Sequence, residues 1–172
     1  MTSDARVSIR QIRALLVLFT VGLVLSGLTA FPLKIEVDIL NGLVGQRSSL
    51  GSLWPETAAW IPRVHAGISE VHRRYPFMLY GTDWLAFAHI IIAVAFLGAV
   101  RDPVRNIWVV EFGMIACVLV VPLALICGGF RGIPFFWRLI DCSFGVFGIL
   151  PLWLARRSTR RLILAEGSRA ST

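Results

Sequence analysis

The run IWVVEFGMIACVLVVPLALICGG, residues 107–129, carries a single charge in 23 residues. A helix of that length rises 1.5 Å per residue and so crosses the roughly 30 Å hydrocarbon core of a bilayer. Three further apolar runs reach or approach this length, at residues 14–32, 84–100 and 134–154. The sequence therefore predicts an all-α integral membrane protein, a four-helix bundle that forms one membrane domain over residues 1–172.

Composition agrees with a membrane protein. Hydrophobic residues make up 56% of the chain and the formal net charge is +7, while the mean hydropathy is +0.75. A soluble domain of this size is less apolar. No basic block alternates with aromatic residues as a nucleic-acid surface requires, so nucleic acid is not an expected partner and the lipid bilayer is.

The arginines are distributed unevenly between the two sides of the predicted membrane. Nine arginines close to the spans lie on one side, and the other side holds fewer cations, most of them in one long loop. Cytoplasmic segments are enriched in Arg and Lys, which predicts a multi-pass inner (cytoplasmic) membrane protein with both termini in the cytoplasm. The nine are Arg6, Arg10, Arg13, Arg101, Arg105, Arg156, Arg157, Arg160 and Arg161; the opposing cations are Lys34, Arg47, Arg63, Arg73, Arg74 and Arg131.

The extracytoplasmic loop at residues 33–83 is the only long segment between spans. Within it, apolar residues recur every three or four positions, which predicts an amphipathic helix. Pro62 suits its first turn and Pro76 its end. We expect this helix to lie on the outer membrane surface or to cap the bundle, and residues 39–54 before it to form a loop. The recurring residues are Ile61, Val64, Ile68, Val71 and Tyr75.

The fourth run places its small and polar residues on one helical face. Starting from Arg138, that face contains Asp141, Cys142, Gly145 and Gly148. We expect it to face the bundle, because polar and small residues of membrane helices contact protein rather than lipid. The bulky residues expected to face lipid are Leu139, Ile140, Phe144, Val146, Phe147 and Leu150.

Two features of the third run also lead to expectations. Pro122 predicts a kink, because proline cannot donate the backbone hydrogen bond of its turn. Glu111 lies near the cytoplasmic end of the run, so we expect it to pair with Arg101, Arg105 or Arg156.

Arg138 and Asp141 are opposite charges three residues apart, a spacing that predicts an ion pair. His89 on the second span and Ser26 and Thr29 on the first lie at a similar depth. Ionisable residues inside a membrane usually mark a functional site, so these five residues are the candidate ligand-binding set. The alternative is a structural role, in which the cluster only fixes the position of the fourth helix.

No catalytic motif, metal site or cofactor is indicated. His65 and His72 are seven residues apart, about 10.5 Å along a helix, too far to bind one ion together. The three cysteines lack metal-binding spacing and are expected to be packing residues.

The sequence favours a non-enzymatic accessory or scaffold subunit, or a small lipid- or quinone-binding protein, whose partners are other membrane subunits or further copies of the chain. The alternative is a membrane-embedded enzyme or a redox protein with haem or quinone. In that alternative His89 and Asp141 exchange protons and Arg138 binds an anion.

Overall fold

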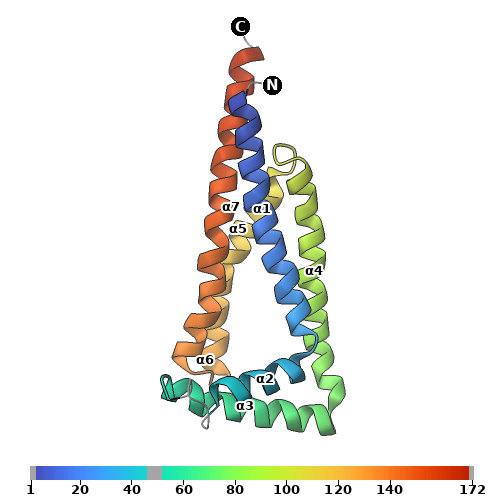
Figure 1. Cartoon of the computed structure of the whole chain (residues 1–172), viewed down its shortest axis with the longest axis vertical. Coiled ribbons are helices and arrows are strands. Elements are labelled where there is room, and N and C mark those ends of the chain that lie inside the picture. Colours follow the sequence, from blue (N-terminus) through green and yellow to red (C-terminus); the bar gives the residue numbers. More distant parts are fainter. Residues whose placement is uncertain (1–2, 46–51, 171–172) are drawn as a thin grey trace. The chain divides into compact units, whose positions relative to one another are not determined.

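The computed structural model describes residues 3–45 and 52–170, and within these ranges the chain is helical with no strand (Figure 1). The prediction of an all-α fold is confirmed. The elements are α1 (Ser3–Ala30), α2 (Leu33–Val44), α3 (Pro55–Arg74), the 3₁₀ turn η1 (Pro76–Leu79), α4 (Tyr80–Arg101), α5 (Ile107–Pro122), the π-helical turn η2 (Leu123–Cys127), α6 (Gly128–Phe130) and α7 (Phe135–Ala170).

In the part of the chain that the structure describes, four helical segments are long and apolar enough to cross a membrane: Ile9–Ala30, Pro76–Arg101, Ile107–Phe130 and Phe135–Ala165. They coincide with the four apolar runs, so the chain is a multi-pass membrane protein of the helical-bundle type. Each is longer than the apolar run itself, because the helix continues into flanking residues. The fourth extends furthest, to Ala165, and the second begins earlier than its run because η1 and the start of α4 precede Trp84.

The chain forms two compact units, and the boundary between them runs through α1 and α4. Unit 1 contains residues 1–22 and 92–172, and unit 2 contains residues 23–91. The single membrane domain that the sequence predicts stays a prediction.

In unit 1, α5 packs along α7 through positions that lack a side chain. A Cβ atom added to Gly145 would lie 2.3 Å from the carbonyl oxygen of Cys117, so only glycine allows this approach. Gly148 lies beside the Cys117 sulfur, and Cys142 is buried. The small-residue face of the fourth span thus contacts protein, as predicted.

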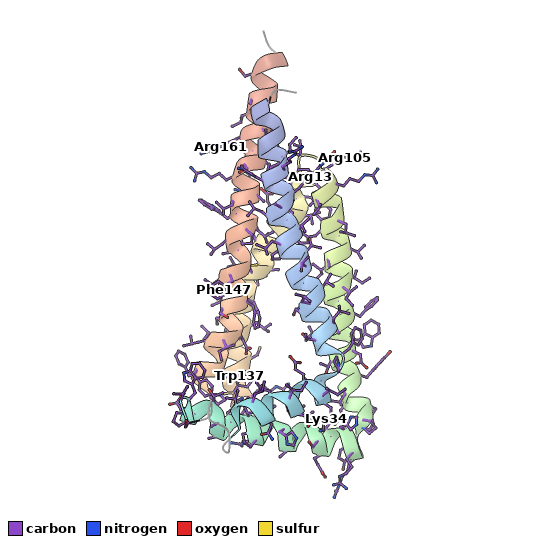
Figure 2. All side chains as sticks on the ribbon, viewed as in Figure 1. Arg13, Lys34, Arg105, Trp137, Phe147 and Arg161 are labelled. Carbon is purple, nitrogen blue, oxygen red and sulfur yellow. The ribbon has the colours of Figure 1, made fainter. Side chains whose placement is uncertain are left out.

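The opposite face of α7 is exposed, as the sequence predicts for a lipid-facing surface. It includes Phe147, labelled in Figure 2. The exposed bulky residues are Leu139, Ile140, Phe144, Val146, Phe147 and Leu150. A row of large, exposed apolar side chains suits a lipid environment.

The third span loses its regular α-helical hydrogen bonding at Pro122. Instead of a simple kink, the five residues after it, Leu123–Cys127, form a π-helical turn. Such turns arise where the regular i to i−4 ladder is interrupted, and proline interrupts it by lacking an N–H group.

In unit 2, α2 and α3 run side by side (Figure 1), and α2 packs against α3. The loop prediction is wrong for residues 39–44, which belong to α2. The helix predicted from Pro62 already begins at Pro55. Burial of Val37 against α3 explains how α2 forms despite Gly42, because tertiary packing outweighs weak helix propensity. Residues 46–51 of the predicted loop, with Arg47, lie outside the described residues.

Candidate functional site

Arg138 lies in the first turn of α7, in unit 1, and its side chain reaches the end of the third span. Nη1 donates a hydrogen bond of 3.1 Å to the carbonyl oxygen of Leu125, a residue of η2. The guanidinium carbon lies 5.3 Å from the centre of the Phe135 ring, within the range of a cation–π contact. Arg138 is therefore held by backbone and by an aromatic ring.

Two glycines shape this site. A Cβ atom added to Gly128 would lie 2.7 Å from Cδ of Arg138, and one added to Gly129 would lie 3.2 Å from Nη1. The side chain therefore rests directly on the backbone of α6. Within the described part of the chain, Nε of Arg138 is enclosed and has no hydrogen-bond partner.

Asp141 lies one turn further along α7 and is partly buried. Within residues 3–45 and 52–170 it forms no ion pair, so the predicted pairing with Arg138 is wrong. The reason is the direction of the arginine side chain. It crosses the glycines toward the Leu125 carbonyl instead of following α7 toward Asp141.

The other three candidate residues belong to unit 2. The His89 Nδ1 atom lies 2.8 Å from the carbonyl oxygen of Leu85; this oxygen can only accept, so Nδ1 carries the proton. Thr29 donates to the carbonyl oxygen of Ser26, at 3.2 Å. A Cβ atom added to Gly27 would lie 3.2 Å from Cβ of His89, so His89 lies on the side of α4 nearest α1.

The five candidate residues therefore fall into two groups. Arg138 and Asp141 lie together on α7 in unit 1, and His89, Ser26 and Thr29 lie in unit 2. A shared cluster of all five stays a prediction.

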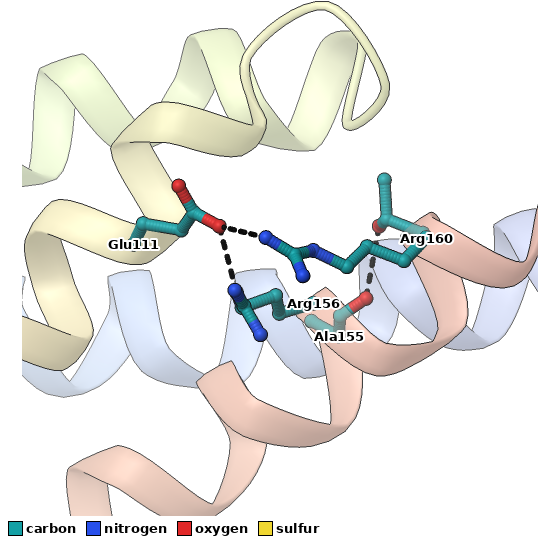
Figure 3. A network of polar contacts seen from close by, with 5 residues as sticks. Glu111, Ala155, Arg156 and Arg160 are labelled. Atoms are coloured by element: carbon teal, nitrogen blue, oxygen red, sulfur yellow. Dashed lines mark hydrogen bonds and ion pairs between the residues drawn. The ribbon is translucent and has the colours of Figure 1, made fainter. Parts of the chain in front are cut away.

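A second charged cluster of unit 1 joins α5 to α7 (Figure 3). Glu111 accepts a hydrogen bond of 2.7 Å from Nε of Arg156 and one of 3.0 Å from Nη2 of Arg160. The expected partner Arg156 is confirmed. Arg160 was missed, although it follows Arg156 by four residues, the spacing that puts two side chains on one helical face.

Unit 2 contains an ion cluster that ties α2 to α3. Nε2 of His65 lies 2.8 Å from Oδ1 of Asp38, and Lys34 pairs with the same oxygen. The Lys34 ammonium, and to a lesser degree His65, lower the pKa of the Asp38 carboxyl below its usual value of 3.8. Among the residues that the structure describes, no three His, Cys, Asp or Glu side chains gather as metal ligands would.

Unit 2 also has a cavity of about 310 Å³, which sequence reasoning missed because residues from four elements line it. This volume is at the lower end of the range for small-molecule sites. Its walls are mostly apolar and include Phe31, Leu33 and Leu79, with Lys34, His72 and Asp83 as charged or titratable groups.

No protein-family model, no curated protein and no solved structure matches this chain. Its function has to be inferred from the charged clusters, the cavity and the exposed apolar faces.

Proposed function

We propose that this chain is a non-enzymatic accessory or scaffold protein of the inner membrane that binds a phospholipid headgroup at Arg138 and Asp141, near the periplasmic face. The observation that supports this most strongly is that these two opposite charges lie one helical turn apart without pairing. An unpaired charge inside a membrane protein is costly, so an external group that compensates both charges would stabilise the site.

The unused hydrogen-bonding capacity of the site matches a headgroup that carries both signs of charge. A guanidinium has five N–H donors, and Arg138 uses one of them on Leu125. Phosphate oxygens accept such donors strongly and often in pairs. The ionised carboxylate of Asp141 only accepts, which suits an ammonium group. Phosphoethanolamine supplies the phosphate and the ammonium in one headgroup.

A quinone fits the same residues less well. Its carbonyl oxygens accept a hydrogen bond from Arg138 but offer no donor to Asp141. The non-enzymatic part of the proposal rests on the other charged groups of the spans. Glu111 is bound by two arginines, and His89 is bound to a backbone carbonyl. These contacts leave few polar groups for acid–base chemistry.

The proposed orientation rests on the sidedness of the arginines. In unit 1, Arg13, Arg105 and Arg161 lie toward one end and Trp137 toward the other (Figure 2). The positive-inside rule makes the arginine end cytoplasmic, and Arg138, next to Trp137 in the chain, then belongs to the periplasmic side.

Native mass spectrometry of the protein in mixed micelles with phosphatidylethanolamine tests the proposal. We expect the parent to retain this lipid, and Arg138→Gln and Asp141→Asn to weaken its binding. Each loses a charge-assisted hydrogen bond of about 1.5–3 kcal/mol, or roughly ten- to a hundredfold in affinity. Arg157→Gln is the matched control, because Arg157 lies on the same helix over the Trp153 ring and should retain the lipid.

Unchanged retention in both site variants would contradict headgroup binding. An absorption spectrum of the purified protein provides an independent check, because a Soret band would indicate haem and place the protein in the redox class instead.

A further inference from the structure

Helix α2 carries a row of large aliphatic side chains that nothing in the described part of the chain covers. Ile35, Ile39 and Leu43 are 60%, 58% and 55% exposed. They follow one another at intervals of four residues, so they share one side of the helix over a length of about 12 Å. A contiguous apolar surface of this kind marks an interaction site or a membrane contact.

A different side of α2 is already occupied. Val37 is buried, and α2 packs against α3. Because Val37 is two residues from Ile35 and from Ile39, it lies on the opposite side of the helix from both. Helix α3 directs charged residues outward, including Arg63, Glu70 and Arg73, all exposed. The pair α2 and α3 thus has a charged outer surface on α3 and a bare apolar row on α2.

Both ends of this helix pair are attached to membrane spans. The first span ends at Ala30 and α2 begins at Leu33, while α3 ends at Arg74 and the second span begins at Pro76. Consecutive spans that enter and leave one loop do so at the same membrane face. The short connections therefore keep α2 and α3 at the boundary of the bilayer.

We infer that α2 lies in the plane of that boundary with Ile35, Ile39 and Leu43 against lipid acyl chains, and that α3 forms a second layer on its water side. In-plane helices bind membranes in this way, with the apolar side in the acyl region and charged residues toward water. Lys34 and the cavity groups His72 and Asp83 lie beside the start of the row, where phospholipid headgroups would contact them.

The membrane contact then lies on α2, and not on α3, where the sequence pattern places it. On α3, Ala58 and Ile61 are buried, and Val64, Ile68 and Val71 are less exposed than the aliphatic row of α2. The membrane contact of α2 is independent of the proposed headgroup site on α7, which involves other residues in the other unit.

Photolabelling of the full chain in nanodiscs tests the inference without altering the protein. One sample contains a phospholipid with a diazirine in its acyl chain, and a second contains a water-soluble diazirine. We expect the acyl reagent to label the α2 peptide severalfold more than the α3 peptide and the aqueous reagent to show the reverse. The variant Arg138→Gln should give the same pattern, so failure here is distinguishable from failure of the headgroup proposal.

A matched pair of variants adds a second readout. Ile39→Asp should reduce acyl labelling of α2 severalfold, whereas Arg63→Asp on α3 should leave it unchanged. Strong aqueous labelling of α2 in the parent would show that the row faces water. Protection of α2 from both reagents would show that protein, such as a second copy of the chain, covers it. Either result overturns the inference.

Discussion

Helix α7 carries two charged sites that differ in how their charges are compensated. At the first, Arg156 and Arg160 share the Glu111 carboxylate of α5. At the second, Arg138 bonds to a backbone carbonyl and Asp141 has no partner within the described ranges. The first site is complete within the protein and fits a structural role. The second leaves a cation and an anion unpaired, which is why we assign ligand binding to it.

The same helix interface supports both sites. Between them, Gly145 and Gly148 bring α7 close to α5, so the distance between the helices controls whether Glu111 can reach its arginines.

The largest effect is expected from filling the α5–α7 contact. In Gly145→Ala the new methyl group would collide with the Cys117 carbonyl, which lies 2.3 Å from its position, and with a Val120 methyl at 2.6 Å. Separation of the helices should lower the free energy of unfolding by up to about 3 kcal/mol. Unfolding in mixed micelles, followed by circular dichroism, measures this. Gly167→Ala is the control, because within the described residues its Cβ position has no atom within 4 Å apart from its chain neighbours and the backbone of its own helix. An equal loss there would contradict the packing explanation.

A smaller effect on the free energy of unfolding should distinguish the Glu111 site, whose charges are paired, from the site of Arg138 and Asp141, whose charges are not. Glu111→Gln removes the negative charge between two arginines and should lower the free energy of unfolding by about 1 kcal/mol, a modest value because the Glu111 side chain is 37% exposed. Asp141→Asn should leave stability unchanged or raise it slightly, since no ion pair is lost and an unpaired charge is removed. The same unfolding assay compares the two. A larger loss for Asp141→Asn would mean that its carboxylate, and not that of Glu111, supports the fold.

The smallest effect is expected at the exposed ion cluster of unit 2, in which Asp38 pairs with Lys34 and His65. The pKa of Asp38 is lowered, chiefly by Lys34. The stabilising effect of the Asp38 carboxylate on the α2–α3 contact is therefore complete at pH values above 3.8, the usual pKa. It is lost as the pH falls through the lowered pKa and the carboxylate takes up a proton. Between about pH 5 and pH 2, pepsin cleavage in α2 should therefore rise more in the parent than in Asp38→Asn, which lacks this titration. Parallel profiles for the two proteins would show that the ion cluster does not hold α2.

Features that depend on one helix at a time could be predicted from the sequence. The four spans follow from the length and apolarity of their runs, and the two faces of α7 follow from the positions of Gly145 and Phe147. The Glu111–Arg156 pair could be predicted because both residues lie near the same end of neighbouring spans.

Features that depend on backbone geometry or on a neighbouring helix could not. The acceptor for Arg138 is the carbonyl oxygen of Leu125, and no side-chain pattern identifies a carbonyl as an acceptor. Helix α2 was missed because its stability comes from Val37 packing on α3, not from its own propensity. The predicted ion pair of Arg138 and Asp141 was wrong because the spacing of two residues along a helix does not determine the direction of their side chains.

The length of α7 has a mechanical consequence. Its 36 residues extend about 54 Å, whereas the hydrocarbon core of a bilayer is only about 30 Å thick. Even with a typical tilt of about 20°, several helical turns protrude from the lipid as a stiff rod. A fluorophore or fusion partner attached after Ala170 would be kept at a set stand-off from the bilayer surface, and a small tilt of the buried part would swing it through a larger arc.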